Sequence, residues 1–160
     1  MSEKPWGLAV KAAIYDQHER CLLVRRSAHN HNFIGLWEWP GGKVDPGEDF
    51  ATGLQREAAE ETGLTIELTG LVGTTAFEMP KINVVILCME ARLIGGTVKL
   101  GDEHDAFAWV PLSDLPRYQY PPPVAKLMLA YARCAPGSNM PGPTHSTTAC
   151  TKRHSSIRLS

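Results

Sequence analysis

Three glutamates, Glu57, Glu60 and Glu61, stand close together near the middle of the chain. Spacings of i, i+3 and i+4 place their carboxylates on one face of a helix, where like charges repel each other. The negative end of the helix dipole would lie beside them and add to that repulsion. An isolated acidic face is usually solvated surface, but clustered carboxylates are also the ligands that hard divalent cations such as Mg²⁺ select. We therefore predict a metal site here.

The residues around this cluster suit a loop that binds a metal and a phosphate. Proline and glycine residues at 40–42 and 46–47 impose a bent backbone before the predicted helix, and Gly63 follows the cluster as a left-handed helix stop. A divalent cation would neutralise phosphate oxygens and lower the pKa of a bound water, which is the chemistry that hydrolyses a phosphoanhydride. Arg56 is expected to orient a neighbouring glutamate rather than to bind the metal.

The cluster belongs to a longer pattern of fixed residues at fixed spacings: Gly42, Glu48, Arg56-Glu57, Glu60-Glu61 and Gly63-Leu64. This pattern resembles the Nudix box, the signature of hydrolases that act on nucleoside diphosphates linked to another moiety. All of its invariant-type positions are filled. Ala58 occupies a position where a larger aliphatic residue is commoner in the family.

The resemblance implies how the residues of the box divide the work. Glu57 and Glu61 would be the principal metal ligands, and Glu60 and the carbonyl oxygen of Gly41 would join them around Mg²⁺, for which Mn²⁺ substitutes. In this family the general base is either a glutamate of the box, to which Glu57 corresponds, or a glutamate on a distant loop. Within the box, the predicted catalytic set is Arg56, Glu57 and Glu60.

A candidate outside the box is Glu103, which is expected to act in catalysis and as a metal ligand. It lies six residues before Trp109, and a metal-binding glutamate of MutT-like family members has the same spacing. An exposed loop acid is the alternative interpretation of Glu103. Asp102 and Asp105 are rival positions for the same role.

The resemblance covers roughly residues 8–131 and extends to MutT-type nucleoside triphosphate pyrophosphohydrolases through segments 22–28 and 37–43. It implies a set of substrate-binding residues: Arg26 (less so Arg25), Trp39, Lys43, Gln119 and Tyr120. The two arginines could equally be the polar end of a strand, and Trp39 could stack on a base or lie in the core.

Tyr120 stands where some MutT-like enzymes read oxidised guanine with an asparagine. A tyrosine cannot offer the paired donor and acceptor of an amide, so the sequence does not predict a preference for oxidised guanine.

The elements that must position these residues follow from hydrophobic patterning. Apolar runs predict a hairpin of strands at 8–15 and 20–26, a loop at 29–35, and strands at 65–77, 82–93 and 107–110. Helices are predicted from residue 48 or 49 to Gly63 and over 123–133. In the first of them the apolar stripe is Phe50 (or Ala51), Leu54 and Ala58. The expected fold is α/β, the Nudix arrangement of a mixed sheet sandwiched between helices, formed by residues 1–134. Residues 135–160 are expected to be a disordered tail.

Composition limits the other possibilities. The formal net charge of −1 argues against a general nucleic-acid binder, and scattered cysteines without zinc-like spacing argue against a zinc site. Cys21 and Cys88 lie in apolar runs and should be buried. No secretory leader or membrane-length apolar run is visible, so we expect a cytoplasmic protein without a membrane partner. The sequence contains no signal for an oligomeric state.

We therefore expect Mg²⁺-dependent hydrolysis of a small-molecule nucleotide. The main hypothesis is cleavage of a (deoxy)nucleoside triphosphate to its monophosphate and pyrophosphate. The alternative is an ADP-ribose or nucleotide-sugar pyrophosphatase. Two further alternatives are removal of pyrophosphate from RNA 5′ ends, and a module that binds a nucleotide without cleaving it, against which the three box glutamates argue.

Overall fold

The computed structural model describes residues 3–134, so the expected tail at 135–160 lies outside the described residues. Ten elements follow one another along the chain: β1 (Trp6–Tyr15), β2 (Arg20–Arg26), β3 (Trp37–Glu38), β4 (Gly41–Lys43), α1 (Phe50–Thr62), β5 (Leu64–Glu78), β6 (Asn83–Gly96), β7 (His104–Pro111), the 3₁₀ helix η1 (Leu112–Arg117) and α2 (Pro122–Arg133). Within the described residues no helix is long and apolar enough to cross a membrane.

The strands form one mixed sheet that opens into two wings. The main strand order is β3-β2-β1-β6-β5, with β4 paired to β1 and β7 paired to β2. β1 runs parallel to β6 over its whole length, but it meets β2 only at Tyr15 and Cys21. One wing therefore consists of β1, β4, β5 and β6, and the other of β2, β3 and β7. The chain crosses from one wing to the other between β3 and β4, where the predicted site lies.

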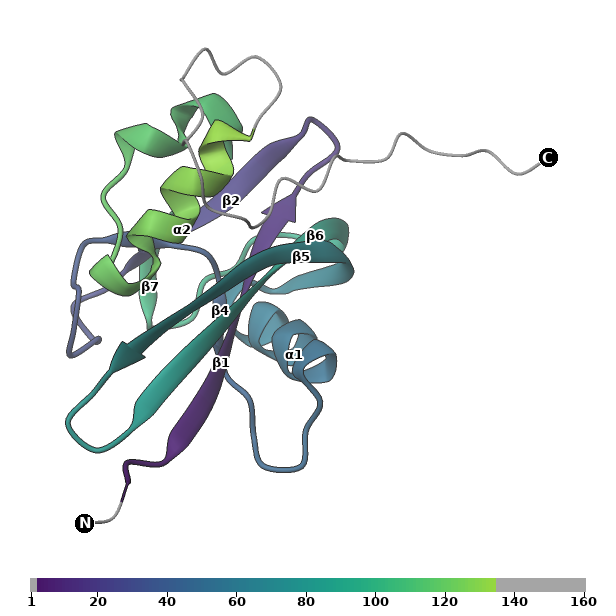
Figure 1. Ribbon diagram of the computed structural model, residues 1–160. Helices are drawn as coiled ribbons and strands as arrows, with labels where there is room; N and C mark the ends of the chain where they lie inside the picture. Colours follow the sequence, from purple (N-terminus) through teal and green to yellow (C-terminus); the bar gives the residue numbers. More distant parts are fainter. Residues whose placement is uncertain (1–2, 135–160) are drawn as a thin grey trace.

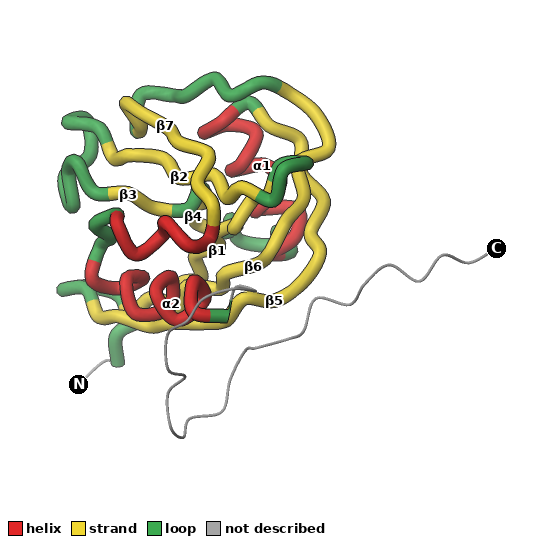
Figure 2. Tube along the Cα trace, turned by 90° about the horizontal axis from the view of Figure 1, so that it is seen from above, coloured by secondary structure: helices red, strands yellow, loops and turns green. Residues whose placement is uncertain are grey.

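Helices cover both faces of the sheet, as expected for the Nudix arrangement (Figures 1 and 2). On the α1 face, Val10 and Ile14 of β1 pack with Leu54 and Ala58. On the other face, residues of β1 and β2 pack with η1 and α2, and Met128 is completely buried. Burying a side chain of this size contributes about 1.5–3 kcal/mol, so the two cores fix both helices against the sheet.

The signals predicted for α1 are confirmed at both ends. Asp49 is the N-cap and accepts a hydrogen bond of 3.0 Å from the backbone N–H of Thr52, and Gly63 ends the helix with a φ of 71°. Such a φ strains any residue with a side chain. One detail is wrong: Phe50 is 40% exposed, so the buried stripe begins at Gly53 and Leu54.

The sequence did not predict the shortest elements of the fold. β3, β4 and η1 were not predicted, because strands of two and three residues show no periodicity. The strand predicted at 20–26 is confirmed with the same bounds, and the other predicted strands exist with shifted ends; the last one, predicted at 107–110, spans His104–Pro111. Cys21 and Cys88 are fully buried, as expected.

Candidate active site

The box glutamates lie against the two glycines of β4. A Cβ atom on Gly42 would lie 2.5 Å from Oε2 of Glu57, so only glycine lets that carboxylate approach the backbone. The backbone N–H of Gly41 donates a hydrogen bond of 2.9 Å to Oε2 of Glu61. Gly41 has a φ of 145°, and a side chain there would overlap the carbonyl oxygen of Val10. The glycines thus bring two of the three predicted ligands onto one short strand.

Arg56 holds the remaining carboxylates in place. Its guanidinium donates to both oxygens of Glu48, at 2.9 and 3.0 Å, and also to Glu57 at 3.0 Å and Glu60 at 3.2 Å. The hydrogen bonds to Glu48 and then to Glu57 raise the pKa of Arg56 above its already high ordinary value. Such a residue fixes the orientation of Glu57, as the sequence led us to expect.

Glu61 is a buried carboxylate whose ionised form a nearby cation would stabilise. Burial raises the pKa of its carboxyl to about 7, although the positive charge of Lys11 and the N–H of Gly41 act in the opposite direction. A cation that binds beside such a buried carboxyl lowers its pKa and favours the ionised form. This property fits the predicted metal site.

The donor set also fits a hard cation. Among residues 3–134, no three acidic, histidine or cysteine side chains converge closely enough to enclose a metal ion as they lie. Glu57 and Glu60 are turned toward Arg56 instead. Carboxylate oxygens are the ligands that Mg²⁺ prefers.

The loop that carries Glu103 is docked on the end of α1. The backbone N–H of Lys99 donates to the carbonyl of Thr62 at 2.9 Å, and that of Gly101 donates to the carbonyl of Glu61 at 3.3 Å. The side chain of Glu103 is exposed beside this junction, so it can turn either to the box or to solvent. Its roles as metal ligand and catalytic group stay predictions.

The rivals of Glu103 have different surroundings. Asp105 forms an exposed ion pair of 2.7 Å with Arg25, which argues against it as a ligand. Arg25 also lies over the ring of Trp37, 5.9 Å from its centroid. The exposed Asp102 accepts a hydrogen bond from Ser27 through its backbone carbonyl.

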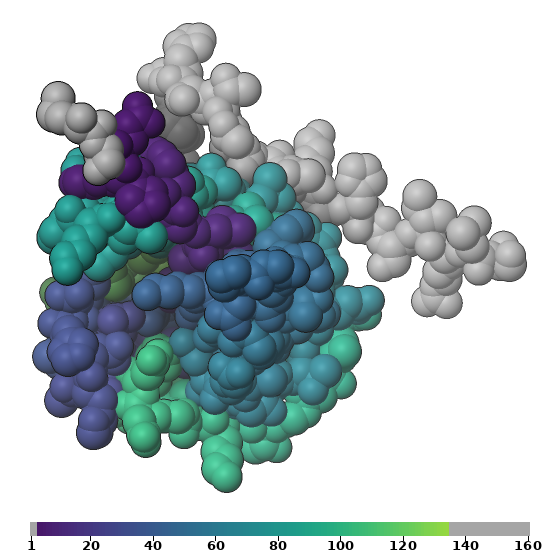
Figure 3. Space-filling model, turned by 90° about the horizontal axis from the view of Figure 1, so that it is seen from below, coloured from purple at the N-terminus to yellow at the C-terminus, as the bar shows by residue number. Residues whose placement is uncertain are grey.

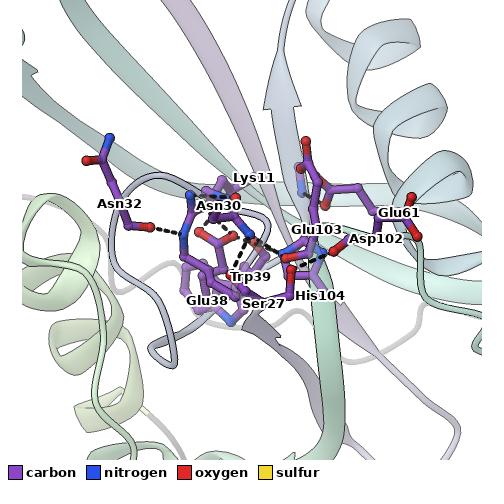
Figure 4. A network of polar contacts seen from close by, with 12 residues as sticks. Lys11, Ser27, Asn30, Asn32, Glu38, Trp39, Glu61, Asp102, Glu103 and His104 are labelled. Atoms are coloured by element: carbon purple, nitrogen blue, oxygen red, sulfur yellow. Dashed lines mark hydrogen bonds and ion pairs between the residues drawn. The ribbon is translucent and has the colours of Figure 1, made fainter.

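A buried polar network that the sequence analysis missed lies next to the box (Figure 4). Its centre is the carboxylate of Glu38, which is 4% exposed. Lys11 donates to this carboxylate at 3.0 Å, Arg26 at 2.9 Å and the Nε2 atom of His104 lies at 3.0 Å. Burial would raise the pKa of Glu38, but the charge of Lys11, the hydrogen bond with His104 and the charge of Arg26 hold it well below its ordinary value. The network therefore contains a permanent anion.

One signal could have led to this network. Lys11 is the single charged residue in the apolar run from Leu8 to Tyr15. A lysine within a buried strand needs a partner of opposite charge. The sequence shows the need, but it does not show that Glu38 meets it.

Arg26, predicted to contact the nucleotide, is largely engaged within the protein. Its guanidinium donates to Glu38, to the Oδ1 atom of Asn30 at 2.8 Å and to the carbonyl of Asn32 at 2.9 Å. Its side chain keeps 21% of its surface exposed. Arg26 thus fastens the loop at 27–35 to the buried carboxylate, and a contact with substrate stays a prediction.

Two of the predicted substrate residues belong to the core. Trp39 has no exposed surface and packs edge-on against Tyr131, with the ring centroids 5.5 Å apart. Tyr120 is 7% exposed, and its hydroxyl donates to the carbonyl of Leu115 at 2.6 Å. This burial agrees with the core alternative for Trp39 and argues against a contact of either side chain with a base, which stays a prediction.

Lys43 and Gln119 are exposed and remain available to a substrate. Their backbone carbonyls are engaged by Arg56 and Trp37 respectively.

The surface is hollowed beside the box. Figure 3 shows the hollow between the loop at 27–35 and α1, with the segment near residue 103 at its rim. A separate cavity of about 550 Å³ lies between the β1–β2 turn and the end of β6; Leu64, the last residue of the box, lines it, but none of the box glutamates does.

Comparisons with known proteins agree with this geometry. The family model described as NUDIX domain matches residues 5–131. The chain is 30% identical over 109 residues to the ADP-ribose pyrophosphatase of Methanocaldococcus jannaschii, which covers 67% of this chain and 63% of that protein. It is also 30% identical to the putative 8-oxo-dGTP diphosphatase of Bacillus subtilis, over 68% of each protein. The chain thus spans less than two thirds of the archaeal relative.

A solved structure extends the similarity to the whole fold. The crystal structure of the MutT protein from Methanosarcina mazei Go1 superposes with a TM-score of 0.73 and 31% sequence identity, and the match covers 83% of this chain and 97% of that one.

Proposed function

The chain belongs to the NUDIX domain family, and from this premise we propose that it hydrolyses (deoxy)nucleoside triphosphates to monophosphates and pyrophosphate with the help of Mg²⁺. The observation that carries the proposal is the placement of Glu57 and Glu61 against the glycines of β4. A carboxylate cluster that the backbone can approach so closely suits a metal that must also reach a phosphate chain.

Each residue of the site has a definite task in this proposal. Glu57, Glu60 and Glu61 would hold the cation, together with the carbonyl of Gly41 and, from its loop, Glu103. When bound, Mg²⁺ neutralises phosphate charge and lowers the pKa of a coordinated water. Glu57 can accept a proton from the attacking water.

The surroundings of Glu57 support its role as the base. Its carboxylate is held by Arg56 at 3.0 Å and packed against Gly42. A fixed carboxylate needs little reorganisation when a proton arrives.

The proposed substrate class rests on the similarity of this chain to its relatives. The similarity to the MutT protein and to the putative 8-oxo-dGTP diphosphatase supports a nucleoside triphosphate. The ADP-ribose pyrophosphatase has the same percentage identity to this chain and supports ADP-ribose as the second candidate. We do not propose a preference for oxidised guanine, since the hydroxyl of Tyr120 is bound to Leu115 and cannot read a base.

A panel of substrates tests the proposal. Purified protein would be incubated with Mg²⁺ and common and oxidised nucleoside triphosphates, ADP-ribose and dinucleoside polyphosphates, with EDTA as the control. We expect pyrophosphate from at least one triphosphate and no release in EDTA. AMP from ADP-ribose without pyrophosphate from any triphosphate would favour the second candidate. Tight binding without turnover would show that the protein is a nucleotide-binding module.

A further inference from the structure

Lys11 has a donor left over inside the protein. Its side chain is 12% exposed and lies in β1, between apolar neighbours. The ammonium group donates to Oε2 of Glu38 at 3.0 Å and to the carbonyl of Trp39 at 3.1 Å. An ammonium group has three N–H donors. Among the described residues the third has no acceptor within hydrogen-bond distance, although an unsatisfied buried donor is costly.

The polar network also has one positive charge more than it needs. Arg26 forms an ion pair of 2.9 Å with Glu38, and His104 adds a contact at 3.0 Å, so this anion is compensated without Lys11. Apart from Glu38, the carboxylate that acts on Lys11 is Glu61, and among the described residues no hydrogen bond or ion pair joins Lys11 to Glu61. Once a cation binds Glu61, Lys11 would keep an uncompensated charge.

β1 brings Lys11 next to the glycines of β4. Lys11 pairs in register with Gly41 of β4, and Gly41 has no side chain to cover its neighbour. The charges of both Glu38 and Glu61 act on the pKa of Lys11, so its ammonium group lies near both carboxylates; Figure 4 shows Lys11 with Glu38 and Glu61. An anion that approaches the box carboxylates with its metal would meet the third N–H donor.

We propose that Lys11 binds a phosphate oxygen of the substrate, next to the metal, and that Glu38 positions it for this contact. The proposal rests on the proposed function and makes it more specific. A lysine ammonium is a compact point charge, which suits a phosphate oxygen better than the patterned edge of a base. Because Arg26 also holds Glu38, removal of Lys11 does not leave the buried carboxylate without a cation.

Two substitutions of Lys11 and a control test this. Lys11→Met removes the charge and keeps the length of the side chain, and Lys11→Gln removes the charge but can still bond to Glu38. Lys81→Met removes the same charge from an exposed position on the β5–β6 turn. Calorimetric titration with Mg²⁺ would measure the binding of nucleoside 5′-monophosphates and of the matching nucleosides.

The expected result is selective. Both Lys11 variants should bind the monophosphates about 10- to 100-fold more weakly than the wild type, the loss typical of one hydrogen bond to a charged group. Binding of the nucleosides should not change, and Lys81→Met should behave as the wild type. If Lys11→Met does not fold, as judged by its thermal midpoint, Lys11→Gln provides the test.

Three results would overturn the proposal: unchanged binding of monophosphates in the Lys11 variants, equal weakening of monophosphates and nucleosides, or a wild type that binds no monophosphate. Turnover of triphosphates by the same wild-type preparation is measured separately. A wild type that binds monophosphates but cleaves no triphosphate would contradict the proposed function and leave the test of Lys11 valid.

Discussion

Replacing Glu61 by glutamine should make the metal-free protein more stable while it destroys the activity. In the folded protein the pKa of this carboxyl is about 7, against an ordinary value of 4.5. Each pH unit between the two values corresponds to about 1.4 kcal/mol. The ionised carboxylate therefore reduces the free energy of unfolding by up to about 3 kcal/mol above pH 8. Glutamine avoids this cost, and its oxygen can still accept the hydrogen bond from Gly41.

The sign of the effect depends on pH. Below about pH 4.5 the carboxyl is protonated in the folded and unfolded states, so it has no influence on stability. As the pH rises from about 4.5 to about 7, the unfolded chain releases this proton before the folded protein does, so the folded state loses stability until the pH exceeds its raised pKa of about 7. In EDTA, the wild type should lose stability between pH 5 and 8.5, and Glu61→Gln should lose less.

Urea unfolding in EDTA at pH 4.5, 7 and 8.5 measures this difference. We expect Glu61→Gln to be about 1–3 kcal/mol more stable than the wild type at pH 8.5 and equal to it at pH 4.5. Glu60→Gln is the matched control, since the side chain of Glu60 is 60% exposed, and it should change stability little. Added Mg²⁺ should stabilise the wild type and not Glu61→Gln. A wild type as stable as Glu61→Gln at pH 8.5 would refute the reasoning.

Three other substitutions have definite expected outcomes. Gly42→Ala would place a methyl group against the carboxylate of Glu57, and kcat/KM should fall at least about tenfold; unchanged kinetics would mean that Glu57 need not lie there. Trp39→Phe should lower the urea midpoint and leave KM unchanged, because the ring is buried. A raised KM in a variant that stays folded would instead support stacking of Trp39 on a base. Glu103→Gln should raise the Mg²⁺ concentration for half-maximal activity at an unchanged thermal midpoint, and an unaltered Mg²⁺ dependence would mark Glu103 as a loop acid.

The features of the site that the sequence predicted each involve residues close to one another in the chain. The limits of α1 depend on Asp49 and Gly63, whose effects act within one helical turn. The shared face of the three glutamates follows from helical periodicity alone. The contact between Arg56 and Glu57 joins neighbouring residues. Such features need no knowledge of the tertiary structure.

The parts that were missed depend on distant segments. The partners of Glu38 come from β1, β2 and β7, and no local pattern pairs them. Trp39 and Tyr120 are aromatic residues next to polar or loop positions, so the sequence left their exposure open. Trp39 and Tyr120 are buried because α2 and η1 pack against the sheet over them.

The pairing of β1 has a consequence for the order in which the protein can fold. β1 lies between β4 and β6, and its parallel partner in β6 begins only at Asn83. Parallel pairing across so long a stretch of chain forms slowly, because the intervening loop must first be closed. During synthesis the acidic helix leaves the ribosome before the strand that completes the sheet. The glutamates of α1 can thus be neighbours before β6 has paired with β1.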